Sequence, residues 1–243
     1  MQRVGSLDDR TTENLRRRFG FDRNTLLIVA ASTHAPEEQV VIEAFKQIKN
    51  SQASYQARLL IAPRHPERFG EVASLLQGSG LMWSRRSAPS QAEDINREVI
   101  LLDTIGELRA VYPLADIAFV GGSIAPHGGH NILEPSAQGV SVITGAYMQN
   151  FAAVTNAMLQ ADAIVQLPKV SASAASAELA NALNSLLSDD SLRRNIGQRA
   201  RVVCDRNRGA TDRTLQIIAD LLETRNPADA SIPFPALSLT ATE

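Results

Sequence analysis

The sequence has only one cysteine among its 243 residues, a net charge near zero and no long hydrophobic run. Because Cys204 has no second cysteine to pair with, an intrachain disulfide is excluded and a reducing compartment is favoured. The formal net charge is -2, which gives no support for nucleic acid as a partner, since nucleic-acid-binding domains usually carry a basic excess. No segment reaches the roughly 18 consecutive apolar residues of a membrane span.

The amino-terminal residues 1–6 also lack the apolar core of a signal peptide. We therefore expect a soluble, cytoplasmic chain, with any membrane anchoring supplied by sequence outside it. Three short basic clusters occur, and we interpret them as solvated helix faces or loop ends, with binding patches as the alternative. These clusters are Arg16–Arg18, Arg85–Arg86 and Arg193–Arg194.

Short β-branched runs alternate with longer segments of helical periodicity along the chain. This alternation predicts an α/β fold, a doubly wound, Rossmann-like parallel sheet with helices on both faces. The strands are near-continuous apolar runs, as buried parallel strands should be. The predicted strands are 25–31, 58–62, 81–84, 98–102, 117–120, 140–144 and 163–166, and the predicted helices are 36–48, 66–76, 104–114, 131–138, 150–159, 175–187, 191–205 and 209–224.

The composition divides the chain into three parts. Residues 1–24 are expected to form a linker and a leading helix, and residues 25–225 a Rossmann-like domain. Residues 226–243 contain three prolines and many small residues, which predicts a flexible tail.

The segment 119–135 is the most informative one. It leaves an apolar strand, crosses two glycine pairs and two histidines, and enters a helix that we expect to begin at Asn131. Glycines let backbone N–H groups approach an anion closely, and a helix N-terminus adds a partial positive charge. We therefore expect a phosphate or carboxylate beside Gly121 and Gly122. The carboxylate of Glu134 cannot bind that anion, so we expect it to accept hydrogen bonds from hydroxyls of the same ligand.

Nearly every unusual polar residue follows directly after a predicted strand. The carboxyl ends of parallel strands meet at one edge of a sheet, so these segments are expected to converge on one rim. All four histidines of the chain belong to these loops. The segments are Ser32–His34, Pro63–Pro66, Asp103–Leu108, Gly121–Ser123 with the loop that follows it, and Gly145.

Several of these residues have structural alternatives. Thr104 and Glu107 have the spacing of a capping box, in which Glu107 only satisfies a backbone N–H. Arg64 is either a surface cation or a two-point ligand of carboxylate or phosphate, in a loop stiffened by prolines. His34 and His65 each have a nearby proline, which indicates a defined turn, with bonding to backbone groups as the alternative.

The segment after the fifth strand also has other interpretations. Asn131 can be an N-cap, with Glu134 three residues later. A metal site of His127, His130 and Glu134 is disfavoured, because glycines separate the two histidines in a loop, unlike the zinc motif on a helix. No metal is therefore expected. A Ser-His-Asp hydrolase is disfavoured because Ser123 lacks the flanking pattern of a nucleophile elbow.

Five blocks, in order and in approximate register between Val4 and Arg213, resemble the signature blocks of the 3-deoxy-D-manno-octulosonic acid (Kdo) transferases. The blocks are Ala31–His34, Pro63–Phe69, Asp103–Leu108, Phe119–Ser123 and Gly128–Pro135. The resemblance implies an inverting glycosyltransferase of the GT-B fold, which transfers Kdo from CMP-Kdo to lipid A precursor at the cytoplasmic face of the inner membrane, in lipopolysaccharide biosynthesis. The chain matches the C-terminal, donor-binding half, so residues 25–225 are expected to bind the nucleotide sugar.

The resemblance also implies that the N-terminal acceptor domain, the membrane-anchoring segment and the catalytic base belong to a half that this chain does not match. The chain alone is therefore expected to be inactive, and to meet a membrane only through that other segment. No cofactor is expected beyond the donor substrate. Two alternatives stay open: a standalone nucleotide-sugar-binding module, and a nucleotide-sugar epimerase or hydrolase with the same half-fold.

Within the donor half, the resemblance assigns roles to individual residues. Arg64 and Ser123, with the neighbouring N–H groups, would stabilise the negative charge on the departing CMP without a metal. Glu134 would bind ribose hydroxyls, and the loop at 105–108 would contact the cytosine. The full expected substrate-binding set is Ser32, Thr33, His34, Arg64, His65, Ile105, Gly106, Glu107, Leu108, Gly121, Gly122, Ser123, Gly129, His130, Asn131 and Glu134.

Overall fold

The structure is a computed structural model that describes residues 7–22, 25–51 and 56–223. The chain forms two compact units, Met1–Cys204 and Asp205–Glu243, and the sheet and its loops belong to the first. The tail predicted at 226–243 lies outside the described residues. The predicted domain borders stay predictions.

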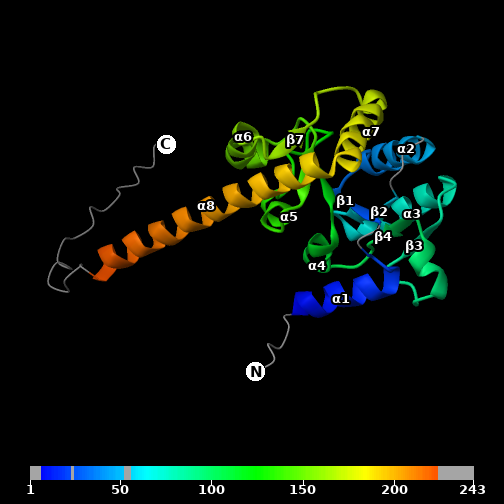
Figure 1. Ribbon diagram of the computed structural model, residues 1–243, viewed down its shortest axis with the longest axis horizontal. Coiled ribbons are helices and arrows are strands. Elements are labelled where there is room, and N and C mark those ends of the chain that lie inside the picture. The colour runs from blue at the N-terminus through cyan, green and yellow to red at the C-terminus, as the bar shows by residue number, and fades with distance from the viewer. Residues whose placement is uncertain (1–6, 23–24, 52–55, 224–243) are drawn as a thin grey trace, which may run out of the picture. The chain divides into compact units, whose positions relative to one another are not determined.

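One seven-stranded sheet forms the centre of the first unit (Figure 1), in the order β3-β4-β2-β1-β5-β6-β7. Every neighbouring pair is parallel, which confirms the predicted α/β fold with a doubly wound sheet. The strand order reverses at β1 and β5, so the loops after these strands flank the crevice where such sheets bind ligands. The strands are β1 (Leu26–Thr33), β2 (Ala57–Pro63), β3 (Trp83–Arg85), β4 (Val99–Leu101), β5 (Ile117–Val120), β6 (Ser141–Thr144) and β7 (Ile164–Gln166).

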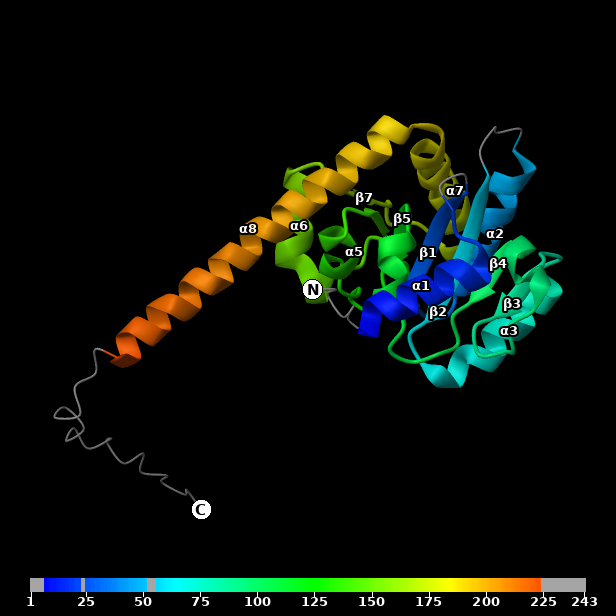
Figure 2. The ribbon, with the colours of Figure 1, turned by 60° about the horizontal axis from the view of Figure 1, so that its bottom comes forward.

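Helices cover both faces of this sheet, because successive strand residues point to opposite faces. In β1, Ile28 and Ala30 enter a core with α2, α3 and α7, whereas Leu27 and Val29 enter a second core with α1 and α4. Figures 1 and 2 show α2 beside α7, with α1 across the sheet from them. The helices are α1 (Leu7–Phe19), α2 (Glu37–Asn50), α3 (Phe69–Gly78), α4 (Leu108–Val111), α5 (Leu133–Ala137), α6 (Ala152–Gln160), α7 (Ala172–Ser188) and α8 (Asp190–Glu223), with short 3-10 helices at Pro66–Arg68, Ala92–Asn96, Tyr112–Leu114 and Gln149–Phe151.

Helix α1 is an integral part of this packing. Leu15 and Phe19 are fully buried against the sheet.

The guanidinium of Arg18 is almost completely covered and pairs with Asp94 at 2.8 Å. Arg193, in another basic cluster, is also buried. The prediction that all three clusters are solvated is therefore wrong for these two arginines, whose charges are held by carboxylates and backbone carbonyls.

Four of the predicted helices have different limits in the structure. The helix predicted at 104–114 begins only at Leu108, and the one predicted at 131–138 is the five-residue α5, beginning at Leu133. The two helices predicted at 191–205 and 209–224 are one continuous helix, the 34-residue α8. A glycine inside a helix costs only about 1 kcal/mol relative to alanine, so Gly209 need not end the helix.

Candidate functional site

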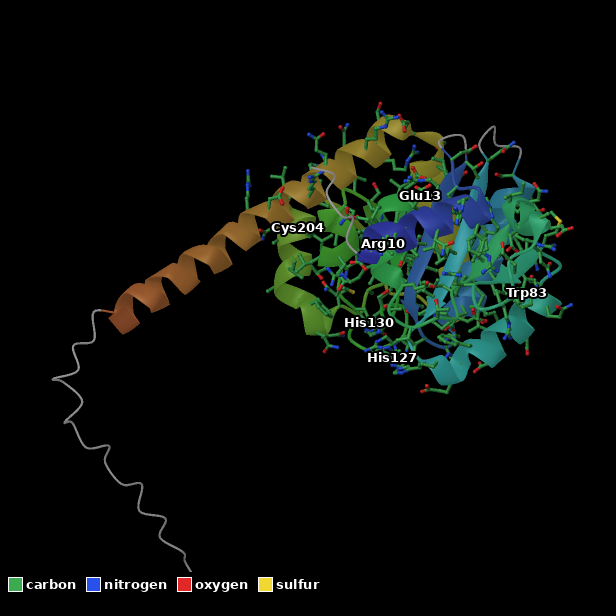
Figure 3. All side chains as sticks on the ribbon, turned by 90° about the horizontal axis from the view of Figure 1, so that it is seen from below. Arg10, Glu13, Trp83, His127, His130 and Cys204 are labelled. Atoms are coloured by element: carbon green, nitrogen blue, oxygen red, sulfur yellow. The ribbon has the colours of Figure 1, made fainter. Side chains whose placement is uncertain are left out.

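The polar loops converge at the carboxyl edge of the sheet, as their positions after the strands predict. His34 follows β1 and His65 follows β2, while His127 and His130 follow β5. The His34 ring centroid lies 4.6 Å from that of His127, 5.0 Å from that of His130 and 5.1 Å from that of His65. Figure 3 shows His127 and His130 next to each other at this edge. We call these four residues the histidine cluster.

Two members of the histidine cluster are bonded to each other. The Nε2 atoms of His34 and His130 lie 2.7 Å apart, so one ring donates through N–H and the other accepts. Burial, followed by the other three histidines and Arg64, lowers the pKa of His34 from 6.5 to about 4. The pKa of His130 is also lowered, first by burial and then by Arg64, His65 and His127. At neutral pH this pair is uncharged, and Arg64 provides a fixed positive charge beside it.

We expect the free energy of unfolding to fall as the pH drops from 7 to 5. The pKa of His34 is about 4 in the folded chain and 6.5 ordinarily, so between these values the unfolded chain binds more protons and acid favours it. The loss is on the order of 1 kcal/mol, less than the full shift implies, because solvent screens the half-exposed ring. Urea unfolding at both pH values, followed by fluorescence of the single tryptophan, measures it for wild type and His34→Gln. Equal pH dependence in the two proteins would contradict the assignment to His34.

We call the loop after β5, residues 121–130, the glycine-rich loop. The backbone N–H groups of its residues 122–124 bind a carboxylate of the protein itself. Glu37, in the first turn of α2, is fully buried. Its oxygens accept hydrogen bonds from the N–H groups of Gly122 at 2.7 Å, Ser123 at 2.8 Å and Ile124 at 2.9 Å. They also accept one from His34 at 3.0 Å. This corrects the expectation that these N–H groups lie open to a ligand: the loop holds an anion, but the anion is Glu37, which sequence reasoning did not single out.

Two hydroxyls expected in the site are buried and bonded internally. Ser123 Oγ donates to a backbone carbonyl of β5 at 2.6 Å and accepts from Gly145 N–H at 2.8 Å. Thr33 Oγ1 donates to the carboxylate of Glu38 at 3.0 Å. Both residues are fully covered. These hydroxyls therefore hold the loops together in this structure, and a direct bond from Ser123 to a leaving group would need them to rearrange.

Glycines place His130 against the loop after β5. Gly122 has a φ of 67°, and a Cβ on it would lie 2.9 Å from the His130 ring. Gly129 N–H donates to the Gly122 carbonyl at 2.7 Å. On the other side of the crevice, Ser32 adopts a φ of 54° where the register of β1 shifts. These backbone conformations bring the ring of His130 to that of His34.

Glu107 does not form the capping box that its spacing allows. Its Oε1 pairs with Arg86 at 2.8 Å, and its Oε2 accepts from Thr104 Oγ1 at 2.5 Å. Helix α4 begins one residue later, and within the described residues the Glu107 side chain caps no backbone N–H. The ion pair with Arg86 instead fixes the loop after β4 against the segment after β3.

The neighbouring residues of this loop differ in exposure. Ile105 is 80% exposed, which is unusual for a large apolar side chain, and Gly106 beside it is exposed with a φ of 85°. Leu108 packs partly against the core on the α1 side of the sheet. Among the predicted ligand contacts of this loop, Ile105 and Gly106 are therefore the two exposed residues.

Asn131 organises the entrance to α5. Its Oδ1 accepts from the N–H of Leu133 at 3.0 Å, and its Nδ2 donates to Glu134 Oε1 at 3.4 Å. The N-cap position of α5 is occupied by Ile132, so the prediction of Asn131 as the N-cap is wrong. The Asn131 side chain instead forms a turn with Leu133 and orients the Glu134 carboxylate. Burial, together with the charge of Glu134, raises the pKa of Tyr112. Because α5 has only five residues, its dipole contributes little to anion binding.

Three further observations concern metal ligands, membrane spans and the cysteine. Across 7–22, 25–51 and 56–223, no group of three or more His, Cys, Asp or Glu side chains is arranged to hold a metal ion. In the same ranges, no helix has the length and apolarity to cross a membrane. Cys204 is buried, and its Sγ lies 3.8 Å from a backbone carbonyl oxygen of α5, as expected for a small apolar residue on a helix.

Comparison with known proteins places this chain in a class of enzymes. The family described as glycosyl transferases group 1 matches residues 11–203, and the chain belongs to this family. It is 36% identical over 196 residues to the 3-deoxy-D-manno-octulosonic acid transferase of Haemophilus influenzae, which covers 80% of this chain and 44% of that protein. With the same enzyme of Bordetella pertussis it shares 38% over 197 residues, covering 81% and 45%.

A solved structure narrows the relationship further. The C-terminal CMP-Kdo binding domain of WaaA from Acinetobacter baumannii superposes with a TM-score of 0.71 at 30% identity, over 81% of this chain and 97% of that domain. The chain is therefore a homologue of the Kdo transferases and corresponds to their C-terminal, GT-B-type half, which confirms the resemblance seen in the sequence. It spans slightly less than half the length of the two transferases above.

Proposed function

We propose that this chain is the donor-binding half of an inverting, metal-independent Kdo transferase. It binds CMP-Kdo and, joined to an acceptor-binding half at the cytoplasmic face of the inner membrane, supports transfer of Kdo to lipid A precursor in lipopolysaccharide biosynthesis. The likeness to the CMP-Kdo binding domain, over 97% of that domain, carries the proposal. The histidine cluster and Arg64 at the carboxyl edge supply groups suited to an anionic donor.

In this proposal, the phosphate of the donor lies against Arg64 and the histidine cluster. As the bond to the sugar breaks, negative charge grows on the phosphate, and preoriented N–H donors and a guanidinium stabilise it. His65 and the one N–H that remains on the His34–His130 pair supply imidazole donors, and Arg64 supplies the permanent positive charge. Thr33 and the residues Gly121–Ser123 act indirectly, since their hydrogen bonds hold the loops that carry these groups.

The nucleoside is assigned to the other side of the same rim. Glu134, oriented by Asn131, accepts hydrogen bonds from the ribose hydroxyls. Ile105 and Gly106 cover a face of the cytosine with an apolar side chain and exposed backbone. The catalytic base is assigned to the acceptor half, because the residues gathered here are suited to hold the donor and its leaving group.

A titration of the isolated chain with CMP and with UDP tests this function. We expect calorimetry to show CMP binding at least about tenfold tighter, equivalent to about 1.4 kcal/mol, because the Ile105 loop meets the base, which differs between them together with the number of phosphates. Transfer from CMP-Kdo to a lipid A precursor should be absent with the chain alone and should appear when an acceptor domain is supplied.

Each other outcome identifies an alternative. Equal or tighter binding of UDP would overturn CMP specificity and favour a nucleotide-sugar epimerase or hydrolase. CMP binding without transfer, even with the acceptor domain, would indicate a standalone binding module. Robust transfer by the isolated chain would refute the assignment of the base to another half.

A further inference from the structure

One carboxylate joins the loop after β1 to the loop after β5. Glu37 Oε2 accepts the N–H groups of His34 at 3.0 Å and Gly122 at 2.7 Å. Its Oε1 accepts those of Ser123 at 2.8 Å and Ile124 at 2.9 Å. A single side chain thus satisfies four backbone donors from segments about a third of the chain apart, and each bond is charge-assisted.

The same bonds set the position of the histidine pair. On one side, His34 is itself a donor to Glu37. On the other, Gly122 donates to Glu37, accepts from Gly129 N–H at 2.7 Å and lies against the ring of His130. The Nε2–Nε2 distance of 2.7 Å between the two rings therefore depends on a path of contacts through Glu37.

A carboxylate is the side-chain group that this position requires. Burying a charge is costly unless hydrogen bonds compensate it. Burial raises the pKa of Glu37 above its ordinary value, and the hydrogen bonds from its four N–H partners offset part of that rise. A glutamine of the same length would replace one oxygen by an NH2 group and set that donor against two backbone N–H donors. The N-terminus of the 14-residue α2 adds a further favourable interaction with negative charge.

We propose that Glu37 is a positioning residue for donor binding: its carboxylate occupies the anion position of the glycine-rich loop and holds the two loops so that His34 and His130 form one pair. This rests on the proposed function for its ligand. A donor phosphate is then bound by Arg64 and the histidine cluster, outside the glycine-rich loop, because the N–H groups of that loop are already bonded to Glu37.

The next residue along α2 provides a matched control. Glu38 is as fully buried as Glu37, but its carboxylate bonds to Thr33 and Arg68, at 3.0 Å and 2.9 Å, and not to the glycine-rich loop. Glu37→Gln and Glu38→Gln therefore both disturb a buried carboxylate at the start of one helix. The amide oxygen introduced by Glu38→Gln can still accept the Thr33 hydrogen bond, and this variant loses only the ion pair with Arg68. Only Glu37→Gln should therefore disturb the histidine pair.

NMR titration of the imidazole signals, without nucleotide, is the decisive measurement. In Glu37→Gln we expect the pKa of His34 to rise from about 4 toward 6.5, because separated rings are less buried and interact less. CMP affinity should fall roughly tenfold. Glu38→Gln should leave the histidine titration unchanged. Unchanged titration in Glu37→Gln, or the same change in both variants, would overturn the proposal.

A second variant covers the case in which Glu37→Gln does not fold. Glu37→Asp keeps two acceptor oxygens and the charge but shortens the reach by one methylene, so we expect a smaller shift of His34 in the same direction. No shift in a folded Glu37→Asp would count against the proposal. If the histidine titration shifts as expected but the wild-type chain binds no CMP, the proposed function fails while the positioning of the histidine pair by Glu37 stands.

Discussion

Replacing Arg64 with alanine is expected to weaken CMP binding about 30-fold, a loss of about 2 kcal/mol, the size typical of hydrogen bonds to a charged group. Arg64 is exposed on the rim, and its charge lowers the pKa of both His34 and His130. Because those two rings are neutral at pH 7, the guanidinium is the permanent cation beside them. Calorimetry at pH 7.5 measures the change. Arg64→Lys should bind with intermediate affinity, since lysine keeps the charge but loses the planar two-point geometry.

Arg194 is the appropriate control for this variant. It is exposed, pairs with Asp190 at 2.8 Å, and acts electrostatically on Asp116, which precedes β5 and therefore lies at the amino edge of the sheet. Arg194→Ala removes the same charge far from the carboxyl edge, so CMP affinity should stay within a factor of about two. Equal losses of CMP affinity in Arg64→Ala and Arg194→Ala would mean that only the net charge of the chain affects binding. Unchanged CMP affinity in Arg64→Ala would mean that Arg64 is not part of the site.

The gathering of the four histidines was predictable because it depends on topology alone. Once alternating strands and helices indicate a parallel sheet, every loop after a strand must reach the same edge, whatever the details of packing. His34 and His130 are 96 residues apart in the sequence and share a hydrogen bond in the structure. The sheet also places Arg64 within electrostatic reach of both, as its effect on their pKa values shows.

The role of Glu37 was not predictable in the same way. In the sequence, Glu37 and Glu38 are two acidic residues in a first helical turn, where acidic residues are common because they favour the helix dipole. Their actual partners lie elsewhere: the N–H groups bound by Glu37 are 85 to 87 residues away. The sequence signal that could have pointed to it is the glycine-rich loop, which predicts an anion but does not say whether a ligand or the protein provides it.

Local patterns failed where a distant partner made a better bond. Thr104 and Glu107 have capping-box spacing, yet Arg86, from a different strand end, pairs with the Glu107 carboxylate. The Glu107 carboxylate is thus bonded to the side chains of Arg86 and Thr104, and the helix begins at Leu108, later than predicted. Thr33 and Ser123 were expected to line the site, but buried partners accept their hydroxyl hydrogens.

Gly121→Ala is expected to destabilise the first unit by about 3 kcal/mol, the upper part of the usual cost of overpacking a core. A Cβ on Gly121 would lie 2.6 Å from the Ser32 carbonyl oxygen, 2.7 Å from Glu37 Oε2 and 2.7 Å from Thr33 Cα. Two of these neighbours are backbone atoms and the third belongs to a carboxylate held by four hydrogen bonds, so none of them yields cheaply. Urea unfolding followed by Trp83 fluorescence measures the loss.

Gly70→Ala is the matched control for this substitution. Gly70 lies within α3, and a Cβ there would meet nothing within 4 Å. Because alanine favours a helix over glycine by up to about 1 kcal/mol, Gly70→Ala should leave stability unchanged or slightly raise it. If Gly121→Ala proved as stable as Gly70→Ala, the loops after β1 and β5 could separate without penalty. Glu37 would then not hold them at a fixed distance, and the pairing of His34 with His130 would need another cause.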